Sequence, residues 1–317
     1  MKIFVLDAIN QKGVDILARH PGTVLWDDPR IAAWREEADG IILRGNTDIT
    51  AADIARAPHL KAISKHGTGV DRIDLAAARA RGIAVMNTPS LNADAVSEMA
   101  MAMTLAVARQ VAFADRTLRA GIALRREDID GSAGGTGGRS MDRKTVAVLG
   151  LGNIGRRVAE RWRLGFGATV VGYDPHLPES AWSALGCERA ERLDDLLPRA
   201  DLVSIHVPLT PETRHFIGAR QLALMKPSAI LVNLARGGVV DEDALYAALA
   251  QQRIFGAALD VFEQEPPVGH RLFGLPNFVG TPHIGAGTID SREQTAVVVV
   301  EQLVDYLSGK PARNRVA

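Results

Sequence analysis

Three residues with complementary chemistry, Arg236, Glu265 and His283, each follow an expected β-strand. The strands are Ile230–Asn233, Gly256–Asp260 and Phe278–Gly280. Because ligands of open α/β sheets bind beyond the carboxyl ends of the strands, we expect the three side chains to share one pocket. Imidazole can pass a proton near neutral pH, a neighbouring carboxylate favours its charged form, and guanidinium binds a carboxylate through paired hydrogen bonds. The trio therefore suits hydride reduction of a 2-oxo acid, in which the carbonyl oxygen must gain a proton.

Each member of the trio also has a structural interpretation. His283 follows Pro282 and could be a turn histidine, Arg236 could close the turn after its strand, and Glu265 could face solvent. Their order after neighbouring strands favours a common chemical role.

The hydride carrier is predicted by the stretch from Lys144 to Pro175. It contains an expected strand (Thr145–Leu149), a turn with Gly150, Gly152 and Gly155, a helix (Ile154 to about Leu164), a second strand (Ala168–Gly172) and then Asp174. The glycines allow a tight turn, close approach of a pyrophosphate and close packing of helix on strand, and the helix N-terminus attracts phosphate. This context predicts a dinucleotide site, and a glycine-rich turn without a ligand is the alternative.

Asp174 selects between the nicotinamide cofactors. A carboxylate at the end of the second strand accepts the hydroxyls of an adenosine ribose and repels a 2′-phosphate. The residues that follow, Pro175 and His176, include no arginine. We therefore expect NAD rather than NADP, with a surface-turn aspartate as the alternative.

Expected strands and helices alternate in two blocks, which predicts an α/β fold with two parallel sheets, each flanked by helices. The first block has strands at Ile3–Leu6, Thr23–Trp26, Gly40–Leu43, Lys61–Ser64 and Ile83–Met86, with helices near Gln11–Arg19, Ala51–Ala57 and Asp71–Arg81. A long helix over Ala93–Ala120 connects it to the second block, whose further strand is Leu202–His206. The glycine cluster Gly131–Gly138 predicts a loop. A final amphipathic helix, Thr288–Leu307, suits packing back onto the first block, so we expect one domain of residues 1–92 with 286–317 and another of residues 93–285.

Composition excludes several classes of protein. The chain has 317 residues, 47% hydrophobic residues and no net charge, which is typical of a globular protein of two domains and argues against nucleic-acid binding. The longest apolar helical run, Met99–Ala108, is too short for a membrane span. The single cysteine, Cys187, excludes an internal disulfide and suits a cytoplasmic protein. We expect no metal site.

At this point the sequence resembles the D-isomer-specific 2-hydroxyacid dehydrogenases. The matching stretches are HGTGVDRIDLAAARARGIAVMNTPSLNADAVSEMAMAMTLAVARQ, GLGNIG with YDP, HVPLTPETRHFIG, NLARGGVVDEDAL, ALDVFEQEP and TPHIGAG. The order is most similar to the phosphoglycerate dehydrogenase and hydroxypyruvate (glyoxylate) reductase branch. The resemblance implies two Rossmann-like or flavodoxin-like domains, a substrate-binding and an NAD-binding one, with the active site in the cleft between them. It also implies a homodimer whose interface includes the long helix and an arm.

The resemblance implies a role for each matching residue. Arg236 would orient the substrate, Glu265 would be the partner carboxylate, and His283 the proton donor and acceptor. The expected cofactor contacts are Gly150, Gly152, Asn153, Ile154, Gly155, Asp174, Val207, Leu234, Ala235, Arg236, Asp260, His283 and Thr68. The expected substrate contacts are Arg44, Lys65, Thr68, Gly69, Arg236 and His283. The amides of Thr68 and Gly69 would receive the substrate carboxylate, and a plain glycine turn is their alternative.

The substrate and the class of protein stay open at this level. Arg44 and Lys65 stand where the phosphoglycerate branch binds a phosphate, but Gly45 replaces a common serine and Arg44 could be a solvated strand-end arginine. The substrate could thus be 3-phosphoglycerate (phosphohydroxypyruvate) or hydroxypyruvate and glyoxylate. Some proteins of this fold are NAD-sensing corepressors that keep the trio. They usually carry extensions for partners, and since we expect none here, the enzyme is favoured.

Overall fold

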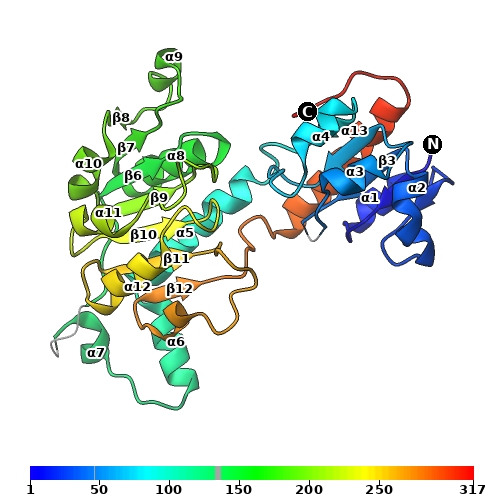
Figure 1. Cartoon of the computed structure of the whole chain (residues 1–317). Helices are drawn as coiled ribbons and strands as arrows, with labels where there is room; N and C mark the ends of the chain where they lie inside the picture. Colours follow the sequence, from blue (N-terminus) through cyan, green and yellow to red (C-terminus); the bar gives the residue numbers. More distant parts are fainter. Residues whose placement is uncertain (46, 133–136) are drawn as a thin grey trace. The chain divides into compact units, whose positions relative to one another are not determined.

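The computed structural model describes residues 1–45, 47–132 and 137–317, which form two compact units. Unit 1 consists of Met1–Asn92 and Ala286–Ala317, and unit 2 of Ala93–Gly285. Each unit is built around a sheet of parallel strands, which confirms the predicted α/β class. Figure 1 shows the elements of both units, and each unit is described by itself below.

Unit 1 contains a five-stranded sheet in the order β2-β1-β3-β4-β5. Its strands are β1 (Ile3–Val5), β2 (Thr23–Val24), β3 (Gly40–Leu43), β4 (Ala62–Lys65) and β5 (Ala84–Met86). Its helices are α1 (Gln11–Leu17), η1 (Pro29–Ala33), α2 (Trp34–Glu37), α3 (Ala51–Ala55), α4 (Leu75–Ala80) and α13 (Ile289–Leu307).

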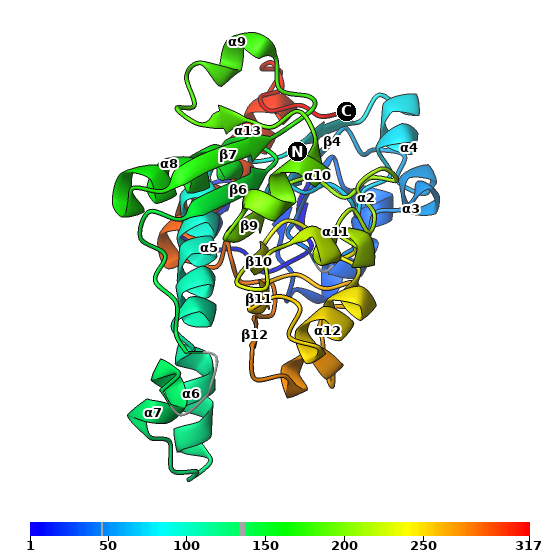
Figure 2. The same cartoon turned by 90° about the vertical axis from the view of Figure 1, so that its left-hand side faces the viewer.

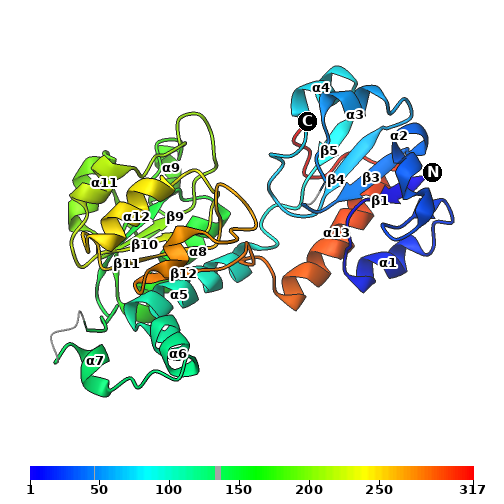
Figure 3. The ribbon, with the colours of Figure 1, turned by 60° about the horizontal axis from the view of Figure 1, so that its bottom comes forward.

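Both faces of this sheet are buried, because successive side chains of a strand point to opposite sides. Phe4 of β1 belongs to the hydrophobic cluster under α2, α3 and α4, whereas its neighbours Ile3 and Val5 belong to the cluster under α1 and α13. Figure 3 shows α13 and α1 together on one face of the sheet. The last helix therefore packs onto the strands of the first block.

Unit 2 contains a seven-stranded sheet in the order β12-β11-β10-β9-β6-β7-β8. Its strands are β6 (Thr145–Leu149), β7 (Thr169–Tyr173), β8 (Glu188–Arg189), β9 (Leu202–Ile205), β10 (Ile230–Asn233), β11 (Gly256–Leu259) and β12 (Phe278–Gly280). Its helices are α5 (Ala93–Ala108), α6 (Val111–Arg119), α7 (Arg126–Asp130), α8 (Asn153–Phe166), α9 (Glu179–Trp182), α10 (Leu193–Leu196), η2 (Leu197–Arg199), α11 (Ala219–Leu224), α12 (Glu242–Ala250) and η3 (Arg271–Gly274).

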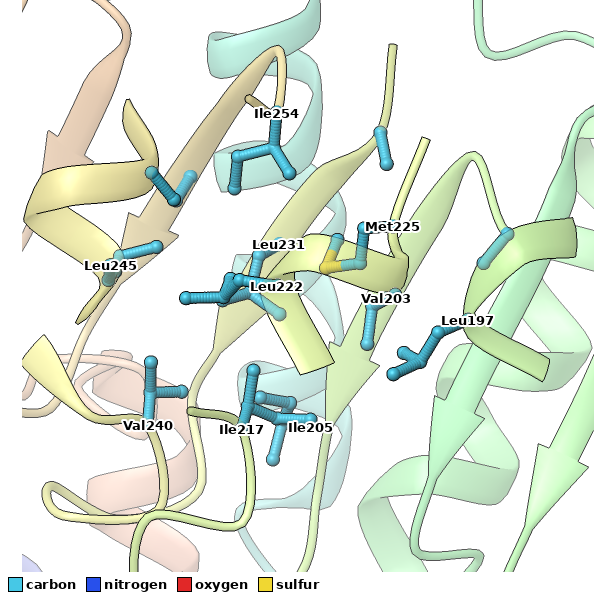
Figure 4. Packing of buried hydrophobic residues seen from close by; sticks show 14 of the residues in the cluster. Leu197, Val203, Ile205, Ile217, Leu222, Met225, Leu231, Val240, Leu245 and Ile254 are labelled. Atoms are coloured by element: carbon cyan, nitrogen blue, oxygen red, sulfur yellow. The ribbon is translucent and has the colours of Figure 1, made fainter. Parts of the chain in front are cut away.

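Helices cover this sheet on both faces as well. α5 lies against β10, β11, β12 and α8, and α8 packs on β6 and β7. The opposite face forms a cluster of buried side chains with α10, α11 and α12, in which Leu222, Leu231 and Leu245 are almost fully buried. Figure 4 shows how these side chains fill the layer between the strands and the helices. The rigid layer holds the carboxyl ends of the strands in place.

The single long helix predicted over Ala93–Ala120 is wrong. The structure has two helices, because Gln110 adopts a left-handed conformation (φ 55°) between α5 and α6. The amide of Arg139 donates to the carbonyl of Ala108 over 2.7 Å, so a distant segment satisfies the end of α5. In Figure 2, α6 and α7 lie beyond the end of α5, away from the strands of unit 2.

Other differences from the sequence expectations are small. Several strand limits shift by one or two residues, such as Ala62–Lys65 for the expected Lys61–Ser64, and the short β8 and helices α7 and α9 to α12 were not expected individually. Part of the predicted Gly131–Gly138 loop, residues 133–136, lies outside the described residues. Among the described residues, no helix is both long and apolar enough to cross a membrane.

Candidate active site

The glycine turn after β6 leaves an open space at the N-terminus of α8. A Cβ atom on Gly155 would lie 1.9 Å from the carbonyl oxygen of Gly150, so the helix can pack this close only with glycine. Gly150 itself has φ +87°, and a Cβ there would lie 2.7 Å from the carbonyl oxygen of His206. Around Gly152, by contrast, a Cβ would meet no described atom within 4 Å. The turn therefore fits a pyrophosphate above Gly152, next to the first residues of α8, Asn153 and Ile154.

Asp174 follows β7 and lies beside this turn. Its Oδ2 atom accepts a hydrogen bond from the amide of Leu151 over 2.9 Å, and its Oδ1 atom accepts one from the amide of His176 over 3.0 Å. Each carboxylate oxygen can accept a further bond. On the other side of the turn, a Cγ atom of Val207 lies 3.0 Å from the Cβ position of Gly150. The predicted adenosine side of the site is thus assembled from the ends of β6, β7 and β9.

Glu265 and His283 are in direct contact beyond the carboxyl ends of β11 and β12. The Nδ1 atom of His283 lies 2.9 Å from Oε2 of Glu265, and the amide of Phe262 donates to Oε1 of Glu265 over 3.2 Å. His283 stays 48% exposed. Since Nδ1 contacts the carboxylate, Nε2 is the ring atom left to exchange a proton with a ligand.

Arg236 is close enough to Glu265 for its charge to act on the carboxylate. Burial raises the pKa of Glu265, but the hydrogen bond and charge of His283, the amide of Phe262 and the charge of Arg236 together outweigh it and lower the pKa below its ordinary value. Glu265 is therefore an anion at neutral pH, and both His283 and Arg236 stabilise its negative charge. The three residues follow neighbouring strands β10, β11 and β12, as the sheet order requires.

Asn233, which we did not predict as a site residue, holds the loop that carries Arg236. Its side chain accepts from the amide of Ala235 over 2.9 Å and donates to the carbonyl of Arg236 over 2.9 Å, and the side chain is buried. The loop includes Leu234, which is buried, and Arg236 donates to the carbonyl of Ala235. An asparagine that bonds the backbone two residues on is a common turn signal, and it could have indicated this role.

Asp260 fixes the loop that carries His283. Its carboxylate accepts from the hydroxyl of Thr281 (2.6 Å) and from the amides of Ile284 and Gly285 (2.8 Å each). Its backbone carbonyl accepts from the amide of His283 over 2.7 Å. Asp260 is only 2% exposed, and these bonds hold the loop that carries the histidine.

The remaining predicted residues belong to unit 1, where Arg44 follows β3, Lys65 is the last residue of β4, and Thr68 and Gly69 come after it. Lys65 is buried, and its ammonium donates to the carbonyl oxygens of Arg44 and His66. Within the described residues, no group accepts a hydrogen bond from the backbone amides of Thr68 and Gly69. This turn can therefore accept an anion from solvent.

A cavity of about 620 Å³ between α5 and α8 contains none of the predicted site residues. Two of its arginines, Arg157 and Arg161, are paired with Asp94 at 3.0 and 3.1 Å. Its charged groups are therefore already partly compensated within unit 2.

Comparison with known proteins gives consistent matches. Residues 101–285 match the family model described as "D-isomer specific 2-hydroxyacid dehydrogenase, NAD binding domain". The chain is 39% identical to a D-3-phosphoglycerate dehydrogenase of Methanocaldococcus jannaschii over 99% of its own length, but it spans only 59% of that relative. It is 36% identical to a glyoxylate reductase of Thermococcus litoralis, covering 99% of this chain and 96% of the other. The chain also aligns over 100% of its length with the crystal structure of the TT0316 protein of Thermus thermophilus, which is covered to 100% as well, with 37% identity and a TM-score of 0.88.

Proposed function

The chain belongs to the D-isomer-specific 2-hydroxyacid dehydrogenase family, and we propose that it catalyses reversible, NAD-dependent reduction of a small 2-oxo acid to the D-2-hydroxy acid. The observation that supports this most directly is the contact of 2.9 Å between His283 and Glu265, beside Arg236 at the carboxyl ends of three neighbouring strands. The chain spans about three fifths of its phosphoglycerate dehydrogenase relative, so the activity of the whole protein is part of the proposal.

The mechanism assigns each residue a separate task. NADH, when bound, supplies the hydride for C2 of the substrate. Arg236 binds the substrate carboxylate and the carbonyl oxygen through its planar donors. His283 donates the proton from Nε2 to that oxygen, while Glu265 at Nδ1 stabilises the doubly protonated ring and holds its orientation. Asp260 holds the loop that carries His283, and Asn233 holds the loop that carries Arg236.

The proposed preference for NAD rests on Asp174. Its carboxylate is held beside the glycine turn, where it would accept the hydroxyls of the adenosine ribose and repel a 2′-phosphate. The fit of the cofactor is supported by the open space around Gly152, which a pyrophosphate would occupy.

The first experiment is a substrate panel. NADH oxidation is measured with glyoxylate, hydroxypyruvate, phosphohydroxypyruvate, pyruvate and bulkier 2-oxo acids, and kcat/KM is compared. His283→Ala should lower kcat by roughly 10²- to 10⁴-fold. His215→Ala is the matched control, because His215 is also paired with a glutamate, Glu263, at 2.8 Å but is not assigned to the site. Wild-type turnover by the His283 variant would refute the assignment.

A phosphorylated substrate is the more specific version of the proposal. Arg44 is close enough to Arg292 that burial and the charge of Arg292 lower the pKa of Arg44. The charge of Asp7 acts in the opposite direction, and its carboxylate accepts from the backbone amides of Arg44 and Gly45. Two cations held near each other favour a dianionic group, so we expect Arg44 to contact a phosphate or a second carboxylate. Lys65 would support Arg44 through its carbonyl. A clear preference for glyoxylate over phosphohydroxypyruvate would contradict this version.

The alternative function, an NAD-sensing binding protein without significant turnover, makes a different prediction. Such a protein would bind NADH with ordinary affinity and oxidise it with none of the 2-oxo acids. The matches to a glyoxylate reductase and to a D-3-phosphoglycerate dehydrogenase favour the enzyme.

We also propose a cytoplasmic homodimer. Helix α6 has no buried residue, and the apolar side chains of Val111, Leu118 and Ile122 are 56%, 58% and 59% exposed. A group of exposed apolar side chains within one segment, here residues 111–122, supports a protein interface. Light scattering should give twice the chain mass, and Leu118→Glu should shift the protein toward the monomer. A monomeric wild type would refute the dimer.

A further inference from the structure

The turn at Thr68 and Gly69 is anchored through its carbonyl groups by two buried residues, Asn87 and Thr88. The side-chain amide of Asn87 donates to the carbonyl of Thr68 over 2.8 Å. The backbone amide of Thr88 donates to the carbonyl of Gly67 over 3.2 Å, and its hydroxyl accepts from the amide of Gly67 over 2.7 Å. Asn87 is 7% exposed and Thr88 is 1% exposed, so both anchors are protected from water.

These carbonyl contacts decide where the neighbouring N–H groups point. A trans peptide is planar, and its C=O and N–H point in opposite directions. The bond from Thr88 to the carbonyl of Gly67 therefore turns the amide of Thr68 away from Thr88, and the bond from Asn87 to the carbonyl of Thr68 turns the amide of Gly69 away from Asn87. No described residue accepts from either amide.

We propose that Asn87 and Thr88 are positioning residues that orient two consecutive amides toward the carboxylate of the substrate. The inference rests on the proposed function, which assigns that carboxylate to this turn. Without Asn87, the peptide between Thr68 and Gly69 can rotate and present its carbonyl, which repels an anion.

Asn87 is itself held by a buried polar network. Gln302 of α13, 1% exposed, donates to the carbonyl of Asn87 over 3.2 Å and to the hydroxyl of Ser64 over 2.9 Å. Asn314 donates to Gln302 over 3.3 Å, and its carbonyl accepts from the amide of Asn87 over 3.2 Å. Ser64, Asn87 and Gln302 are buried, whereas Asn314 lies exposed at the edge of the network. A bonded network of buried groups favours one geometry, because an unpaired member would be costly. The segment after α13 thereby supports the anion turn.

The kinetic test uses Asn87→Ala, with Asn87→Asp as a variant of equal size that cannot donate to the carbonyl of Thr68. Glyoxylate is the substrate, because its only anionic group is the carboxylate in question. Both variants should raise the KM for glyoxylate roughly 10- to 100-fold, the effect of losing a charge-assisted hydrogen bond, with a smaller change in kcat and an unchanged Kd for NADH. Asn10→Ala, which removes only the N-cap of α1 in the same unit, should leave the KM unchanged.

A second measurement does not depend on turnover. Oxalate is titrated into the ¹⁵N-labelled wild-type protein with NADH, and the amide resonances of Thr68 and Gly69 should move downfield, whereas those of Asn87→Asp should not. Shifts in the wild type without turnover on any 2-oxo acid would refute the proposed function and keep the inference. Turnover with an unchanged KM in both Asn87 variants, or no oxalate-dependent shift at either amide, would overturn the inference.

Discussion

Replacing Glu265 with Gln should slow the reaction without removing the proton donor. The carboxylate lies 2.9 Å from Nδ1 of His283, and a hydrogen bond to a charged group contributes about 1.5–3 kcal/mol. Water screens this pair, because His283 is 48% and Glu265 34% exposed, so the lower half of that range applies. Since about 1.4 kcal/mol corresponds to a tenfold change, we expect kcat/KM to fall roughly 10- to 40-fold.

The pH dependence gives this prediction a specific signature. Reduction requires a protonated ring, and Gln cannot stabilise the doubly protonated imidazole as a carboxylate does. The fall of reductive activity on the alkaline side should therefore begin at a lower pH in the variant. The assay is NADH oxidation by the best 2-oxo acid between about pH 5 and 9.

The chain offers a matched control two residues away. Glu263 is paired with His215 at 2.8 Å, so Glu263→Gln removes the same type of contact outside the site. It should leave both kcat/KM and the pH profile unchanged. A Glu265→Gln enzyme within twofold of the wild type, or an equal loss in both variants, would refute the role given to Glu265.

Three further predictions concern the cofactor turn and the stability of unit 1. Asp174→Ala should raise the KM for NADH and should increase the ratio of kcat/KM with NADPH to kcat/KM with NADH at least roughly tenfold. The variant loses two hydrogen bonds from the ribose hydroxyls to the carboxylate, and it no longer repels a 2′-phosphate. Equal use of both cofactors by the wild type would contradict this prediction. Gly155→Ala should destabilise the fold by about 3 kcal/mol or more, since its Cβ would lie 1.9 Å from the carbonyl oxygen of Gly150. Gly152→Ala should keep the wild-type Tm and weaken NADH binding, because its Cβ would meet no described atom within 4 Å. Thermal melts and NADH titrations distinguish the two variants, and equal Tm values would contradict the close packing at Gly155. Burial and the charges of Arg44 and Lys65 lower the pKa of His66 from 6.5 to about 4. As the pH falls, His66 therefore gains its proton in the unfolded chain before it does in the folded protein. The free energy of unfolding should decrease by up to about 3 kcal/mol between pH 6.5 and 4. Urea unfolding of His66→Asn should lack this decrease, and an identical pH dependence of the wild type and the variant would refute the prediction.

The alternation of apolar strands and helices along the sequence was sufficient to predict the architecture. Alternating apolar strands and helices predicted two parallel sheets, and the order of glycines before α8 predicted where a cofactor turn would lie. The limits of β6, β10 and β12 were predicted to the residue, because each is a short apolar run with turn residues after it. The break between α5 and α6 was missed, since it depends on the contact of Arg139 with Ala108, which are far apart in the chain.

By itself, the sequence determined which chemical groups follow the strands, because the order of strands along the chain and the alternation of their side chains are local properties. Only the tertiary structure decided how those groups are oriented. The contact of His283 with Glu265, the bonds of Asp260 to Thr281, Ile284 and Gly285, and the bond of Asn87 to Thr68 all join residues from different segments of the chain. Hydrogen bonds require an exact distance and direction, and these follow from how the strands and helices pack rather than from the spacing of residues along the chain.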